Sequence, residues 1–342
     1  MLSTGDKIKV EEKTEKLWLL DVIRGFSALL IVLYHYTTQY DISIGHIVPY
    51  AVKVPWGCHA VYTFFLLSGF LTVYSYKEKT TPLAFLKKRF LRLYPMFWVC
   101  MVVTTAYIVL LLPDRVPSLK QFIFNITMIP SFFGFKAVDG VYWTLAKELM
   151  FYFGFAAVIQ FYGIRSKRYL WLWCWLMLEI ICTIIPPRWI VSALLIPEYL
   201  FAFLAGSAVY YFNHSCSRKE KGFLTVYLLV CILLCTKMHS MDIVLVFVLS
   251  LCALLIGSQE NLNSNLSCVK SFFRPVLFLS EISYVLYLTH QFIGFGLIHK
   301  METNGFTAEA WVLLPIAHAV LLATFLHYKV ETKINKVLNR YR

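Results

Sequence analysis

Charged residues are scarce in this chain. They make up 15% of its 342 residues, whereas 59% of the residues are hydrophobic and 17% are aromatic. Soluble globular proteins average about 25% charged and about 45–50% apolar residues, so the composition is that of a membrane protein. No stretch is long and polar enough to form a separate soluble domain. We therefore expect a single integral membrane domain.

Several other signals are also missing. The sequence shows no internal repeat and no low-complexity tract. Its nine cysteines form no disulfide framework and show no paired metal-ligand spacing. Most of them, such as Cys100 and Cys231, lie in apolar segments, where cysteine behaves as a small hydrophobic residue. We expect no metal site.

Apolar windows of roughly 20 residues recur along the chain, and each is long enough to cross about 30 Å of hydrocarbon. The predicted fold is all-α, with ten membrane-spanning helices over residues 17–328, between an N-terminal segment 1–16 and a C-terminal tail 329–342. Asp21 and Arg24 interrupt the first window and no cleavage site follows, so we interpret it as a retained helix. The ten windows lie near 17–37, 56–76, 95–112, 141–162, 169–185, 190–212, 223–237, 241–257, 276–298 and 308–328.

Basic residues indicate the orientation. If the connections alternate between the two sides, most of the 32 Lys and Arg residues fall on the side that holds both termini, which predicts cytoplasmic termini. Lysines that face anionic membrane lipids explain the net charge of +13 without a nucleic-acid partner. The segment 81–95 mixes Phe85 and Leu86 with Lys87 and Arg89. This pattern predicts an interfacial helix on the cytoplasmic face.

The first predicted span carries Arg24 and His35, which are 11 residues apart. That spacing is about three helical turns, so both side chains project from nearly the same face, roughly 16 Å apart along the axis. Charges inside a membrane span are costly and usually functional. The alternative is that each residue fills a polar gap between helices. The pair predicts a fixed cation near the inner side and a titratable base near the outer side.

Three further polar residues lie in other spans. Glu148 and His290 are expected at the depth of His35, and Ser68 near mid-membrane. Each has an alternative interpretation: Glu148 as the salt-bridge partner of Lys147, His290 as a packing residue, and Ser68 with Gly69 as a small-residue helix contact, the interpretation we favour for that pair. Depth alone does not show that these residues share a cavity.

Six segments, taken in order, resemble the multispanning membrane acyltransferase family 3, whose bacterial members O-acetylate surface polysaccharides. Arg24 and His35 match its motif of an arginine and a histidine separated by ten residues. The resemblance covers nearly the whole chain, and its segments are LDVIRGFSALLIVLYHY (20–36), FFLLSGF (64–70), FLKKRFLRLYP (85–95), WTLAKELMFY (143–152), ISYVLYLTHQF (282–292) and HYKVETKINKVL (327–338).

The resemblance implies transfer of an acyl group, usually acetyl, from cytoplasmic acyl-CoA to a carbohydrate hydroxyl at the bacterial cytoplasmic membrane. It implies that Arg24 and His35 are essential, that Glu148 matches a family acid, and that Arg89 and Arg92 match a cytoplasmic basic motif. One departure is Lys147 beside Glu148, where many members carry another acid.

The residue chemistry agrees with this implication. Arginine binds phosphate through charge-assisted hydrogen bonds, so we expect Arg24, Arg89 and Arg92, with Ser68, to hold acetyl-CoA. His35 then acts as general base on the acceptor hydroxyl or accepts the acyl group itself. Glu148 or His290 orients the His35 imidazole. These four, Arg24, His35, Glu148 and His290, are the catalytic candidates.

Two other functions are compatible with the sequence. A transporter or flippase for a small acid or a lipid-linked sugar would use the buried charges as a proton relay. A membrane sensor or scaffold would leave Arg24 and His35 without a role. The sequence leaves open the carbohydrate acceptor and whether it is lipid-linked, the choice between acetyl and succinyl, and the oligomeric state.

Overall fold

A computed structural model describes residues 17–77, 79–162, 169–185, 187–189, 194–196, 198–215 and 217–338. The predicted N-terminal segment 1–16 and the last residues of the predicted tail lie outside these ranges. The described part is helical, with no strand. The α-helices are α2 (Trp18–Tyr34), α3 (Tyr40–Ser43), α4 (Val61–Tyr74), α5 (Pro82–Leu111), α6 (Leu119–Asn125), α7 (Trp143–Tyr162), α8 (Leu170–Ile184), α10 (Leu200–His214), α11 (Arg218–Met238), α12 (Met241–Gly257), α13 (Glu260–Asn265), α14 (Arg274–Thr303), α15 (Leu313–Leu326) and α16 (Thr332–Leu338).

Six helical segments of the described chain are long and apolar enough to cross a membrane, which makes this a multipass membrane protein. The four remaining predicted spans overlap α7, α8, α10 and α12, and residues 190–193 and 197 of the predicted span 190–212 lie outside the described residues. Three of these have 15 to 17 residues, and α7 carries Lys147 and Glu148. The count of ten and the orientation of the termini stay predictions. The six segments are Trp18–Ser43, Pro55–Tyr74, Pro82–Leu111, Arg218–Met238, Ser267–Thr303 and Glu309–Leu338.

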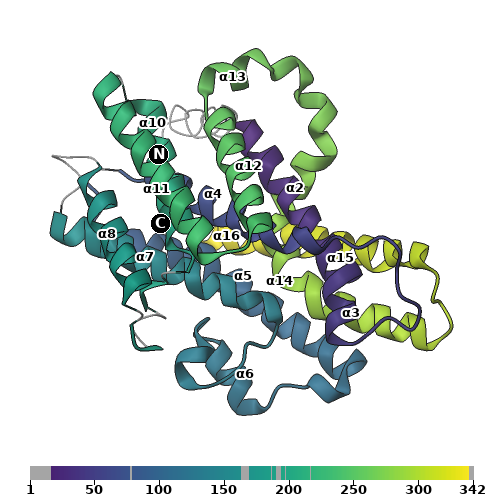
Figure 1. The fold of residues 1–342 in the computed structure, drawn as a ribbon. Helices are drawn as coiled ribbons and strands as arrows, with labels where there is room; N and C mark the ends of the chain where they lie inside the picture. The colour runs from purple at the N-terminus through teal and green to yellow at the C-terminus, as the bar shows by residue number, and fades with distance from the viewer. Residues whose placement is uncertain are drawn as a thin grey trace.

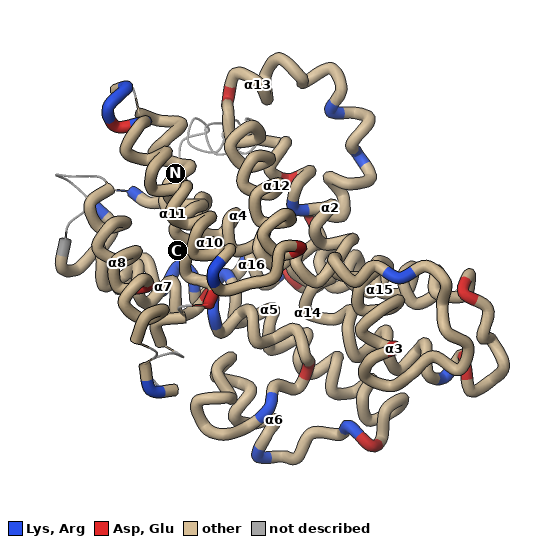
Figure 2. Tube along the Cα trace, viewed as in Figure 1, with Lys and Arg blue, Asp and Glu red and all other residues tan. Residues whose placement is uncertain are grey.

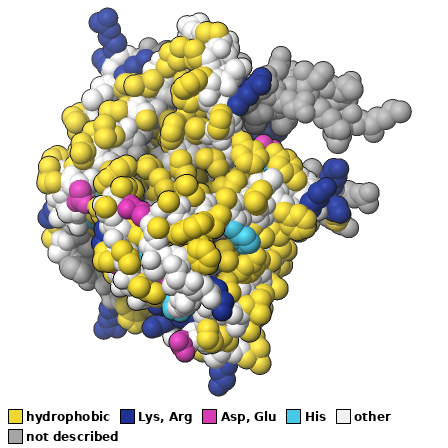
Figure 3. All heavy atoms as spheres, turned by 90° about the vertical axis from the view of Figure 1, so that its right-hand side faces the viewer, with side chains coloured by type: hydrophobic (Ala, Val, Ile, Leu, Met, Phe, Trp, Pro, Cys, Tyr) yellow, Lys and Arg dark blue, Asp and Glu magenta, His cyan; other side chains and the backbone are white. Residues whose placement is uncertain are grey.

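The surface agrees with a membrane location. Figure 3 shows a face covered largely by hydrophobic side chains, with lysines and arginines mostly toward its periphery. Along the trace in Figure 2, long uncharged stretches separate short charged ones. The eight described cysteines are all free.

The segment 81–95 is not a separate interfacial helix, and that prediction was wrong. It forms the first half of α5, which continues to Leu111 with Pro95 inside it. The reason lies in the burial of Arg89, whose side chain is only 6% exposed. The amphipathic pattern places some cations outside the protein, but this one belongs to its interior.

Helices α4 and α10 approach each other through two glycines. A Cβ atom on Gly69 would lie 1.9 Å from the Phe203 carbonyl oxygen, and one on Gly206 would lie 1.9 Å from the Leu66 carbonyl oxygen. The Ser207 hydroxyl also donates to the Gly69 carbonyl at 3.2 Å. Small residues permit such contacts between membrane helices, and this one fixes α4, one wall of the candidate site.

Helix α14 occupies a central position and packs against α2, α5 and α15 (Figure 1). Near His290, α14 closely contacts the residues that follow α2. The Tyr36 hydroxyl donates to the His290 carbonyl at 2.8 Å, and the Tyr36 ring leaves no room for a Cβ atom on Gly294. The α2–α14 interface therefore brings two of the predicted site residues, His35 and His290, together.

Candidate active site

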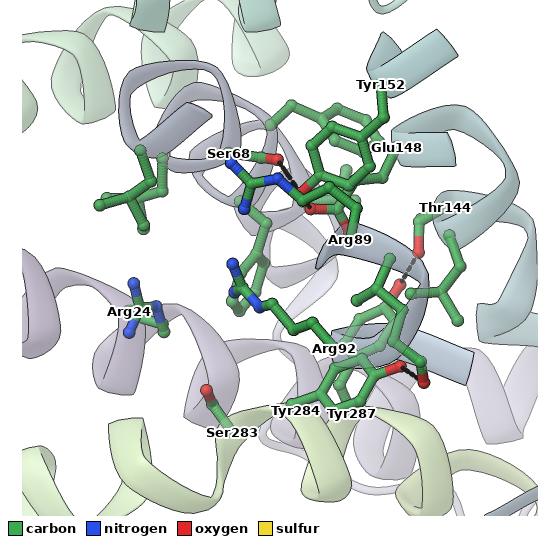
Figure 4. Close-up of a pocket in the computed structure, with 17 residues that line it drawn as sticks. Arg24, Ser68, Arg89, Arg92, Thr144, Glu148, Tyr152, Ser283, Tyr284 and Tyr287 are labelled. Carbon is green, nitrogen blue, oxygen red and sulfur yellow. Dashed lines mark hydrogen bonds between the residues drawn. The ribbon is translucent and has the colours of Figure 1, made fainter. Parts of the chain in front are cut away.

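A cavity of about 120 Å³ lies among α2, α4, α5, α7 and α14. Three guanidinium groups face it, and Glu148 is the only acid among its lining residues (Figure 4). This excess of positive charge suits an anionic ligand. The polar side chains that line it include those of Arg24, Ser68, Arg89, Arg92, Glu148 and Tyr152.

Two of these cations come from one face of α5, because Arg89 and Arg92 are three residues apart. The Arg89 guanidinium donates to the Ser75 hydroxyl at 3.0 Å and lies 4.8 Å from the centre of the Tyr152 ring. Its Nε atom is buried and finds no hydrogen-bond partner in the described part of the chain. Buried donors are almost always paired, so this one is available to a ligand.

Arg24 reaches the same cavity from α2. Its guanidinium pairs with the carboxylate of Asp21 at 2.9 Å, and the Arg24 side chain is about one quarter exposed (25%). Asp21 in turn accepts from the Ser280 hydroxyl of α14 at 3.5 Å. The ion pair thus lies at the edge of the cavity, and the other N–H groups of the Arg24 guanidinium are open to the cavity.

Glu148 is held by hydroxyl groups and not by its neighbour Lys147. Its Oε1 atom accepts from Ser68 at 2.7 Å and also from the Tyr152 hydroxyl. The Lys147 ammonium lies instead 5.6 Å from the centre of the Tyr199 ring. Two neighbouring residues of the FFLLSGF segment thus have different environments. Gly69 makes the helix contact, whereas Ser68 faces the cationic cavity.

A second cavity, of about 320 Å³, contains His35. Its polar lining includes Tyr34, Gln39 and Gln291. His35 is the first residue of a π-helical turn, His35–Gln39, that follows α2 without a break. Such turns are rare and frequently occur at functional sites. The local sequence did not predict this π-helical turn.

The imidazoles of His35 and His290 are in direct contact. His35 Nδ1 lies 2.9 Å from the Ile31 carbonyl oxygen and 3.1 Å from His290 Nε2. His290 Nδ1 lies 3.0 Å and 2.9 Å from the carbonyl oxygens of Leu286 and Tyr287.

These contacts assign the neutral tautomers of both rings. A carbonyl only accepts, so each Nδ1 carries a hydrogen. His290 Nε2 is then an acceptor, and it receives the His35 Nδ1–H. The remaining lone pair of His35, on Nε2, is free for chemistry in the cavity. His290 orients the ring of His35 as the third member of a catalytic triad would.

The four predicted catalytic residues divide between the two cavities. Arg24 and Glu148 line the cationic cavity, whereas His35 lines the second cavity and His290 contacts it from behind. The lining residues common to both cavities are Val61 and Tyr287. The Tyr287 hydroxyl bonds to the Thr144 hydroxyl at 2.7 Å (Figure 4). Tyr287 is therefore a wall between the cation cluster and the histidine pair.

Comparison with known proteins agrees with this arrangement. The family model described as an acyltransferase domain matches residues 17–329. The chain belongs to acyltransferase family 3.

Two curated relatives of this chain are similar over shorter stretches. Protein 2 in the picA locus of Rhizobium radiobacter is 34% identical over 120 residues, which are 32% of this chain and 56% of that protein. Nodulation protein 10 of Rhizobium leguminosarum bv. viciae is 25% identical over 167 residues, 43% of this chain and 45% of the relative. The chain thus spans about half the length of the relatives it matches. No solved structure matches it.

Asp139 is a buried acid that the sequence analysis did not single out. Asp139, in the connection before α7, is fully buried. Its carboxylate accepts from the backbone N–H of Val141 at 3.2 Å and from that of Phe292 at 3.1 Å. It therefore ties the start of α7 to α14, two residues beyond His290. An Asp-Gly pair just before a predicted helix is a capping signal that could have drawn attention to it. Burial raises the pKa of Asp139 to about 7.

Proposed function

We propose that this protein transfers an acyl group, acetyl in the first instance, from acyl-CoA to a hydroxyl of a cell-surface polysaccharide or of its lipid-linked precursor at the bacterial cytoplasmic membrane. The observation that carries the proposal is the pairing of two cavities across one wall. A cluster of cations lies on one side of Tyr287, and a histidine with a free Nε2 lies on the other.

The cationic cavity supports the donor half of the proposal. Coenzyme A is an anion, and three guanidinium groups line this cavity, where they are suited to attract its phosphates. A cavity of about 120 Å³ is too small for a whole nucleotide, since small-molecule sites usually measure about 300–1,000 Å³. We therefore place the phosphates at the mouth and the pantetheine arm inside. The rise of a helix over 11 residues, about 16 Å, separates Arg24 from His35.

The histidine cavity supports the acceptor half. His35 Nε2 takes the proton of the acceptor hydroxyl, and the oxygen attacks the thioester carbonyl carbon. The carbon–sulfur bond breaks, and the departing thiolate takes the proton back from the His35 imidazolium. During this step the Nδ1–H of His35 stays hydrogen-bonded to His290 Nε2 and to the Ile31 carbonyl. Both contacts stabilise the cation that forms.

The experiment is incubation of the purified protein, reconstituted with membranes of its host, with acetyl-CoA that is radiolabelled in the acetyl group. Matched membranes without the protein are the control. We expect label in the glycan fraction and an equal amount of free coenzyme A thiol only when the protein is present. Succinyl-CoA in a parallel reaction tests the acyl group. Movement of solute without release of thiol from any donor would contradict the proposal and indicate a transporter.

A further inference from the structure

Gln291 follows His290 on α14 and lines the cavity of His35. Its side chain is 7% exposed. Its Oε1 atom is buried and accepts no hydrogen bond from the residues that the structure describes. Buried side-chain oxygens are nearly always paired, so a lone acceptor beside a cavity points to a missing donor.

The amide of Gln291 is also held in place. It packs on the backbone of Gly140, where a Cβ atom would lie 2.5 Å from Oε1 and 2.8 Å from Nε2. The flanking residues on both elements, Val141 and Phe292, donate their backbone N–H groups to Asp139. The oxygen is therefore presented by a rigid wall and not by a mobile side chain.

The other side-chain hydroxyl and amide groups of this cavity are already paired. The Tyr34 hydroxyl donates to Gln39 Oε1 at 2.5 Å, and Gln39 Nε2 donates to Ser43 at 2.8 Å. The Tyr287 hydroxyl is paired with that of Thr144. Among the described residues, two side-chain acceptors of this cavity receive no hydrogen bond, namely Nε2 of His35 and Oε1 of Gln291. Two acceptors match a ligand that brings two hydroxyl donors.

We propose that Gln291 binds a second hydroxyl of the acceptor, next to the hydroxyl that His35 deprotonates, so that the site selects molecules with neighbouring hydroxyl groups. This inference rests on the proposed acyl transfer and adds the acceptor's chemistry. Gln291 acts here by binding and orientation, and the proton transfer belongs to His35. A site built to pair a hydroxyl discriminates strongly against a ligand that lacks it.

The test uses the glycan fraction that the wild-type protein labels, with Gln291→Met as the variant. Methionine keeps the length of the side chain and removes the amide oxygen. We expect the KM for the glycan to rise about tenfold, with the KM for acetyl-CoA within twofold of wild type. Slow hydrolysis of acetyl-CoA without glycan should also stay within twofold. Gln291→Glu, which keeps an acceptor oxygen, should retain more of the glycan affinity. Gln160→Met, at an exposed position of α7, is the matched control.

Two results would overturn the inference. One is an unchanged KM for the glycan in Gln291→Met; the other is an equal loss of transfer and of glycan-free hydrolysis, which would indicate a structural role. NMR of the product adds an independent measurement, because the acetylated carbon should have a free hydroxyl on the adjacent carbon. Absence of any transfer by the wild-type protein would count against the proposed function instead.

Discussion

The contact between His290 and His35 predicts a specific loss of rate when the His290 acceptor is removed. As His35 takes the proton, its Nδ1–H becomes part of a cation, and hydrogen bonds to charged groups contribute about 1.5–3 kcal/mol. Each 1.36 kcal/mol corresponds to a factor of ten, so kcat should fall about 10- to 150-fold in His290→Ala. The bond from His35 to the Ile31 carbonyl at 2.9 Å remains, which keeps the loss within this range.

The assay compares kcat and the KM for acetyl-CoA in His290→Ala and His290→Phe with those of the wild type. Phenylalanine restores the buried volume without an acceptor nitrogen, so both variants should be slow, with KM for acetyl-CoA unchanged. His35→Ala should be slower still, because general-base catalysis contributes about 10²–10⁴-fold. Adding His290→Ala to it should cost little more, because the two residues act as a unit. A normal rate in His290→Phe would refute the orienting role and leave His290 as a packing residue.

Three other predictions concern the two cavities and the buried Asp139. Arg92→Ala should raise the KM for acetyl-CoA about tenfold or more and the KM for the acceptor by less. Lys87→Ala, on the exposed side of α5, is the control and should change neither KM. An equal rise in both KM values for Arg92→Ala would contradict the donor site. Tyr287→Phe removes the hydrogen bond to Thr144, which contributes about 0.5–1.5 kcal/mol. Hydrolysis of acetyl-CoA without glycan, measured as thiol release, should therefore rise about threefold to tenfold. An unchanged hydrolysis rate would contradict the role of Tyr287 as a wall between the two cavities. Burial raises the pKa of Asp139 from 3.8 to about 7. Between these pH values the folded protein keeps a proton that the unfolded chain releases, so stability falls as pH rises. Asp139→Asn should flatten this part of the curve of unfolding temperature against pH, and parallel curves for the variant and the wild type would contradict the prediction.

Hydrophobic pattern was sufficient to predict most of the long helices. Nine of the ten predicted windows fall on helices of the described chain, because an apolar run of this length has few other stable forms in lipid. The window 190–212 coincides with α10 only from Leu200 onward, and part of it lies outside the described residues. The ends were less predictable. The basic residues before Pro95 belong to α5, since the partners that bury Arg89 come from α4 and α7, far away in the sequence.

The grouping of the candidate site residues could not be predicted from the sequence. Intramembrane charges must face a polar interior, which is why Arg24 and the α5 arginines meet in one cavity. Depth in the membrane says nothing about direction around a helix axis. Glu148 was expected at the depth of His35, as one of two candidates to orient its imidazole, and instead bonds to Ser68 in the other cavity. Asp139 was missed because its partner, the Phe292 N–H, becomes apparent only when α14 is in place.

The most direct test of the central claim is acyl transfer by His35→Ala in the reconstituted system, with label counted in the glycan fraction and thiol release measured in parallel. We expect this variant to insert normally, to bind acetyl-CoA with an unchanged Kd, and to transfer no measurable label. Label retained covalently on the wild-type protein would add an acyl-histidine step to the same account. Normal labelling of glycan by a correctly inserted His35→Ala protein would contradict it.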